Sequence, residues 1–164
     1  MKRNDKGFTL IELIAVMVII GIVAAIATIS ISTSSSARTE RLAVSVDSLI
    51  SKCRAGCLGR TGDVKLTILL DGTNIVCNYY ENGNVSTDTF ERNGIDVSYT
   101  TKPTDSNTET TTVLTAATPL NISFNRSTGG QTEHSGLYYT SISFTGGRTY
   151  TIELKPLTGF HRVV

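Results

Sequence analysis

The spacing of hydrophobic residues changes along this chain, and each change predicts a different element. From Phe8 to Ile31 nearly every residue is apolar, and Glu12 is the only charged one. At about 1.5 Å of rise per residue, a helix of this length could cross the roughly 30 Å hydrocarbon core of a bilayer. A helix that is apolar on all sides is normally buried, either in lipid or among other helices. We therefore expect a helix that is transmembrane or lies in the core of an assembly.

The helical pattern continues beyond this apolar stretch, because no proline or glycine occurs between Ile22 and Ala55. Three glycines, Gly56, Gly59 and Gly62, then remove helical preference and predict the end of the helix. The prediction is one long helix over residues 8–57, amphipathic in its second half. The stripe that it would bury has apolar residues at steps of three or four: Leu42, Val46, Leu49, Cys53 and Cys57.

After Gly62 the pattern alternates with a period of two, which is typical of strands with one buried face. Asp71-Gly72 predicts a hairpin turn, whereas the polar stretch from Lys102 to Thr112 predicts an exposed loop. The fold class is therefore α+β: a long N-terminal helix, transmembrane in its first half, packed on an antiparallel β-sheet domain over residues 58–164. The expected strands are Val64–Leu70, Ile75–Tyr80, Val85–Phe90, Ile95–Thr101, Leu120–Phe124, Ile142–Phe144 and Tyr150–Leu154.

A short basic segment, residues 1–7, precedes the apolar helix. Lys2, Arg3 and Lys6 outweigh Asp5, and such an excess of positive charge favours keeping this end in the cytoplasm. The protein would then cross the cell membrane once, with its bulk outside. A carboxylate inside hydrocarbon costs about 2.5 to 3.5 kcal/mol, so Glu12 is expected to have a partner.

The junction Gly7-Phe8-Thr9-Leu10-Ile11-Glu12, behind a basic leader and before an apolar helix, resembles that of the type IV prepilin and pseudopilin family. The resemblance implies cleavage between Gly7 and Phe8 by a prepilin peptidase and methylation of the new Phe8 amine. It also implies assembly through the helix with other pilin or pseudopilin subunits, on an inner-membrane platform. Glu12 would then pair with the Phe8 amine of its own or a neighbouring subunit.

The C-terminal part resembles the domain of GspH/FimT-type minor pseudopilins, which typically end in a Gly-Arg-x-Arg stretch. Here the corresponding residues are Gly159, Phe160, His161 and Arg162, so the first arginine is missing. This resemblance implies a minor or initiating subunit. The machine that it serves would be a type IV pilus, a competence pilus or a type II secretion pseudopilus.

Several alternatives stay open. Ala25-Ile26-Ala27 could be the cleavage site of an ordinary signal peptide, and the helix could instead be the uncleaved anchor of a surface adhesin. Glu12 could simply be tolerated near a helix N-terminus, where the macrodipole favours negative charge. A DNA-binding pilin is a further alternative, with phosphate contacts from four residues near C-terminal turns: Arg148, Lys155, His161 and Arg162.

Little in the sequence indicates catalytic chemistry. Neither of the two histidines, His134 and His161, has a partner at a metal-ligand spacing, and the formal net charge is only +1. We expect no cofactor, no metal and no enzymatic activity. The three cysteines allow two interpretations: a disulfide that joins Cys53 or Cys57 to Cys77, or three small core residues.

Overall fold

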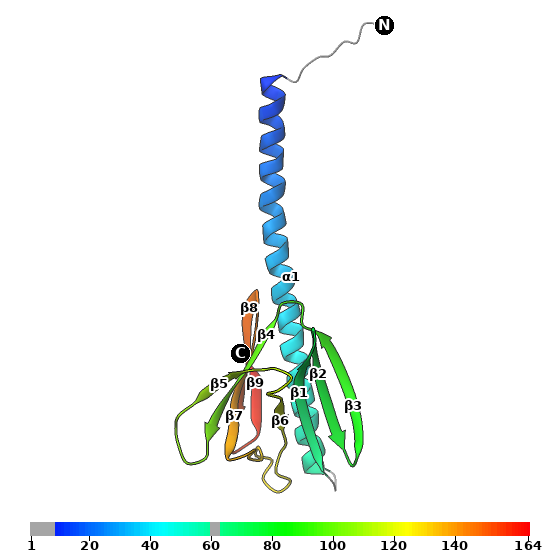
Figure 1. Ribbon diagram of the computed structural model, residues 1–164, viewed down its shortest axis with the longest axis vertical. Coiled ribbons are helices and arrows are strands. Elements are labelled where there is room, and N and C mark those ends of the chain that lie inside the picture. Colours follow the sequence, from blue (N-terminus) through cyan, green and yellow to red (C-terminus); the bar gives the residue numbers. More distant parts are fainter. Residues whose placement is uncertain (1–8, 60–62) are drawn as a thin grey trace.

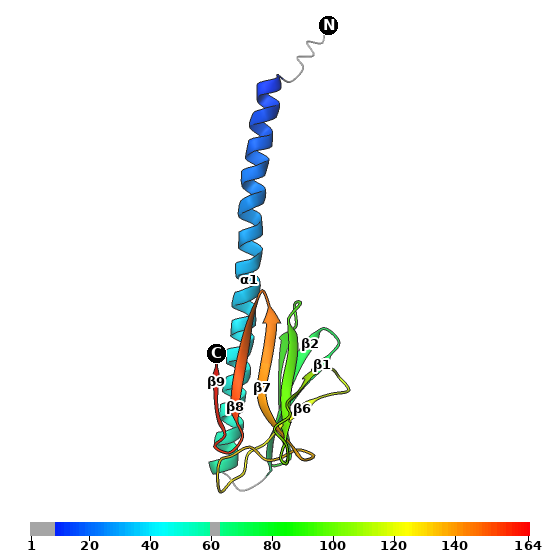
Figure 2. The same cartoon turned by 90° about the vertical axis from the view of Figure 1, so that its left-hand side faces the viewer.

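The computed structural model describes residues 9–59 and 63–164, apart from the side chains of residues 26–33. A single helix, α1 (Leu10–Gly59, 50 residues), runs the length of the molecule, and its first half projects away from the β-strands (Figures 1 and 2). The prediction of one long helix is confirmed. Gly56, which was expected to help end it, lies inside α1, where an added Cβ would meet the Tyr79 hydroxyl oxygen at 2.6 Å. Its missing side chain therefore permits close packing against a strand.

The two halves of α1 have different surroundings. Every side chain from Thr9 to Ala25 is exposed, whereas the expected stripe from Leu42 to Cys57 faces the strands. Ile50 is fully buried in place of Leu49, which is only half-buried. Among the residues that the structure describes, no helix is long and apolar enough to cross a membrane, so the transmembrane assignment is not confirmed.

The first sheet has four antiparallel strands in the order β3-β2-β1-β6. Asp71 pairs with Asn74 across the predicted hairpin turn, where Gly72 has φ +59°. Strand β3 is the outer edge and is almost entirely exposed. The strands are β1 (Val64–Asp71), β2 (Asn74–Glu81), β3 (Asn84–Glu91) and β6 (Leu120–Ile122).

The second sheet has five antiparallel strands in the order β5-β4-β7-β8-β9. Two of them were not predicted: β5 lies within and just after the expected Lys102–Thr112 loop, and β9 begins directly after Gly159, where no strand was expected. Both are edge strands of four residues, formed by pairing with β4 and β8. The strands are β4 (Asp96–Pro103), β5 (Thr110–Val113), β7 (Leu137–Gly146), β8 (Arg148–Lys155) and β9 (Phe160–Val163).

The second half of α1 packs against strands of both sheets, so one core joins the three layers (Figure 1). Burying a large apolar side chain contributes about 1.5 to 3 kcal/mol, which makes this core the main stabilising feature. Fully buried members come from the helix and from each sheet: Val46, Ile50, Ile68, Ile75, Ile142, Phe144 and Ile152.

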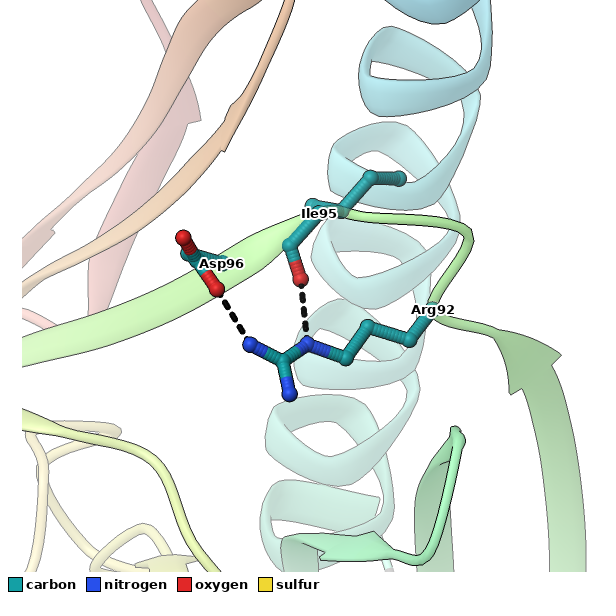
Figure 3. A network of polar contacts seen from close by, with 3 residues as sticks. All are labelled: Arg92, Ile95 and Asp96. Atoms are coloured by element: carbon teal, nitrogen blue, oxygen red, sulfur yellow. Dashed lines mark hydrogen bonds and ion pairs between the residues drawn. The ribbon is translucent and has the colours of Figure 1, made fainter.

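The connection from β3 to β4 carries the chain from one sheet to the other beside α1 (Figure 3). Arg92 closes this turn, because its Nε donates to the Ile95 carbonyl at 2.9 Å and its guanidinium pairs with Asp96. Asn93 and Gly94 supply the positive φ that the turn requires. The turn leaves Ile95 buried against the core.

Candidate assembly site at the helix N-terminus

Glu12 lies in the first turn of α1 and caps it together with Thr9. The Thr9 amide and hydroxyl both donate to Glu12 Oε2 at 3.0 Å, and the Glu12 amide donates back to the Thr9 hydroxyl at 3.4 Å. This reciprocal pattern is a capping box, whose signature Thr-x-x-Glu stands at residues 9–12. This capping role was not among the predictions, although the Thr-x-x-Glu signature is visible in the sequence.

Only one oxygen of the Glu12 carboxylate is used by the cap. Among the described residues, Glu12 Oε1 has no hydrogen-bond partner, and the side chain is exposed. A carboxylate with one occupied and one open oxygen can keep its helix capped and still accept from an ammonium group. Gly7 and Phe8, the predicted cleavage and methylation residues, lie outside the described residues.

The surface around Glu12 is apolar on every side of the helix. Leu10 is 76% exposed, Ile11 71% and Met17 69%, and the other large apolar side chains up to Val23 are 49–60% exposed. This is far more contiguous apolar surface than a monomer in water normally presents. This apolar surface must therefore be covered by another apolar partner, and Glu12 would be the charged residue within the covered region.

The three cysteines are free thiols and all are buried in the core. Hydrogen bonding with Cys53 lowers the pKa of Cys57, and the same contact, with burial, raises the pKa of Cys53. Burial raises the pKa of Cys77 to about 12. The disulfide that would join Cys77 to the helix stays a prediction.

The four residues proposed for nucleic-acid contact do not form one surface. Arg148 begins β8 and Lys155 ends it, so they lie at opposite ends of an eight-residue strand. Arg162 is paired with Glu153 on the neighbouring strand at 3.0 Å. With one arginine neutralised and the two ends of β8 far apart, the arrangement gives DNA no continuous row of cations at these positions.

His161, the fourth of these residues, faces α1 instead of solvent. Its side chain is 7% exposed, its Nε2 lies 2.8 Å from the Ser51 hydroxyl, and its Nδ1 lies 3.1 Å from the Gly159 carbonyl oxygen. A proton on Nδ1 would leave Nε2 to accept from Ser51. Asp47 Oδ1 lies 3.9 Å from the same Nε2. These contacts fasten the last strand to the helix, and nothing in the sequence pattern indicated them.

A comparison with protein-family models gives one match, the prokaryotic N-terminal methylation motif, over residues 2–28. No match was found among curated proteins or among solved structures. The matched segment includes Gly7, Phe8 and Glu12, and it does not extend to the C-terminal domain, so the GspH/FimT-like subtype is not confirmed. Through this segment the chain carries the N-terminal signal of type IV prepilin-like proteins.

Proposed function

We propose that this protein is a non-enzymatic structural subunit of a type IV pilin-like filament, in a minor or initiating position. The filament would be a type IV pilus, a competence pilus or a type II secretion pseudopilus. The single observation that carries the proposal is the exposed, apolar first half of α1, with Glu12 at its start and the methylation motif over it. Lipid would cover this half before assembly, and helices of neighbouring subunits would cover it afterwards.

In this proposal a prepilin peptidase cleaves between Gly7 and Phe8, and the Phe8 amine is then methylated. The open Oε1 of Glu12 accepts this ammonium group from an adjacent subunit. Two opposite charges about 4 Å apart attract by roughly 4 kcal/mol at an effective dielectric constant near 20. Removing only one partner would leave a charge buried and unpaired, which is strongly unfavourable. Glu12 would therefore select subunits that are correctly placed along the filament axis.

The test separates the charge of Glu12 from its capping role. Glu12→Leu removes both, Glu12→Gln keeps an oxygen that can accept from Thr9, and Thr9→Ala weakens the cap by about 1 kcal/mol while it keeps the carboxylate. The measurement is the amount of each variant in sheared filaments relative to the amount in membranes, with the mature N-terminus identified by mass spectrometry.

Cleavage before Phe8 should persist in all three variants. Incorporation should fall at least tenfold for Glu12→Leu and for Glu12→Gln, and stay near the wild-type level for Thr9→Ala. Normal incorporation of Glu12→Gln would show that the charge is not an assembly contact. A mature protein that begins at Thr28, or an uncleaved Met1, would contradict the proposed processing.

A further inference from the structure

A cleft lies at the end of the second sheet where strands β7 and β8 separate. Their pairing stops at Ser141 and Glu153, although β7 begins at Leu137 and β8 continues to Lys155. The register of β7 against β4 also shifts between Thr100 and Thr101, which indicates a bulge. Bulges bend a strand and often occur beside functional sites.

Gln131 holds the two strands apart. Its side-chain oxygen accepts from the Tyr139 backbone amide at 2.7 Å, and its backbone N–H donates to the Pro156 carbonyl at 2.6 Å. One buried residue thus bonds to both sides of the gap. The opening is therefore fixed by hydrogen bonds of a buried residue and does not depend on the rotamer of a surface side chain.

The cleft has a volume of about 740 Å³, within the range of small-molecule sites. Its walls combine hydroxyl groups from Thr140, Ser141 and Thr151 with the ring of Tyr138, and Leu157 stands at its edge with 85% of its surface exposed. Hydroxyl groups can both donate and accept hydrogen bonds, and a tyrosine ring offers a flat apolar face. This combination suits a ligand that has many hydroxyl groups and an apolar face.

The charges that line the cleft favour an anionic ligand. Lys102 and Lys155 both line it, and in the part of the chain that the structure describes neither has an ion-pair partner. Of the two lining carboxylates, Glu153 is already paired with Arg162, and only Glu109 is left to accept from a ligand hydroxyl. Two open cations beside one open acceptor match a molecule with both a carboxylate and hydroxyl donors.

We propose that this cleft binds an acidic saccharide, a sugar unit of the uronic acid type, with its carboxylate between Lys102 and Lys155 and its ring against Tyr138. This inference does not depend on the proposed assembly role, because every residue in it belongs to the second sheet and its loops. It would give a filament subunit an adhesive site at the far end of its domain from the projecting helix.

The test is calorimetric titration of the full-length protein in detergent with digalacturonate, and with neutral galactobiose as the matched probe. Digalacturonate should bind and galactobiose should bind at least tenfold more weakly. Lys102→Ala, Lys155→Ala and Tyr138→Ala should each weaken the digalacturonate affinity at least fivefold. Lys65→Ala is the matched control and should change nothing, because Lys65 is an exposed lysine of the first sheet, away from the cleft.

Four outcomes would overturn the proposal. Equal binding of the acidic and neutral sugars would remove the role of the lysines, and unchanged affinity in the three variants would place any binding elsewhere. Tighter binding of a triglutamate peptide than of digalacturonate would reassign the cleft to acidic peptides. Absence of any binding of either sugar at low salt would also contradict the proposal. Circular dichroism of each variant separates lost binding from lost folding.

Discussion

At the scale of single residues, close contacts between the backbone of a turn and α1 decide which positions tolerate substitution. The turn between β7 and β8 touches α1 at its run of serines, where the Thr39 hydroxyl donates to the Gly146 carbonyl. Gly147 has φ +74°, and a Cβ there would lie 2.9 Å from the Ser36 backbone nitrogen. In the sequence alone, the small residues of this segment look like a break in the helix. In the structure they are the surface of α1 on which the β7–β8 hairpin docks.

Gly147→Ala should therefore destabilise the protein more than the same change at an open turn. A left-handed φ costs a residue with a Cβ about 1 to 2 kcal/mol, and overpacking adds about 1 to 3 kcal/mol. Gly83→Ala is the control, since Gly83 has φ +82° and nothing within 4 Å of an added Cβ. Urea unfolding measures both, and equal losses of stability would contradict the docking contact.

The three thiols should differ in reactivity because their pKa values differ. Hydrogen bonding with Cys53 lowers the pKa of Cys57, whereas the raised pKa values of Cys53 and Cys77 keep them protonated at neutral pH. Iodoacetamide should modify Cys57 first, and the rate of its modification should fall as the pH is lowered. Peptide mapping of the folded protein after timed labelling checks this, with Cys57→Ser as the control. Earlier labelling of Cys77 would refute the order.

At the scale of elements, edge strands depend on partners that are distant in sequence. Strand β9 pairs with β8 and is also fastened to α1 through His161 and Ser51. Among the described strands, β5 pairs only with β4, across a row of threonines. Neither segment has the alternating apolar pattern that predicts a strand, because an edge strand needs little burial of its own.

His161→Ala should loosen β9 while the rest of the sheet stays intact. Loss of a nearly buried side chain and of its hydrogen bond should cost about 1 to 2 kcal/mol. Hydrogen exchange of the Phe160–Val163 amides should then be faster by at least tenfold. Arg162→Ala removes only an exposed ion pair, worth about 0 to 1 kcal/mol, and is the matched control. A larger effect of Arg162→Ala would mean that the ion pair, and not the contact with α1, holds the strand.

At the scale of the whole molecule, stability and assembly are located in different halves of α1. The buried residues begin at Thr39, and every side chain described before Ala25 is exposed. The folded domain therefore needs only the second half of the helix. The first half contributes an apolar surface that no strand covers (Figure 2).

A chain shortened to residues 34–164 should accordingly fold, stay monomeric in water and unfold within a few degrees of the full-length protein in detergent. The full-length protein without detergent should self-associate, because its exposed apolar half has no cover. Light scattering gives the association state, and thermal circular dichroism gives the unfolding temperature. A shortened chain that fails to fold would show that the first half of α1 also stabilises the domain.

The sequence by itself determined the long helix, the β hairpin at Asp71-Gly72 and the processing motif around Gly7, because each depends on residues that are neighbours in the chain. Periodicity also located most strands, and the capping role of Glu12 was readable in Thr9 to Glu12. Such signals act over a few residues and need no knowledge of the fold.

Only the tertiary structure decided which segments meet. It placed β5 and β9 by backbone pairing, put Gly56 against Tyr79, and turned His161 toward α1 instead of toward solvent. It also separated Arg148 from Lys155 and brought Lys102 and Lys155 to one cleft. These contacts join residues far apart in the chain. Their energies depend on interatomic distance and burial, and neither can be read from the order of residues alone.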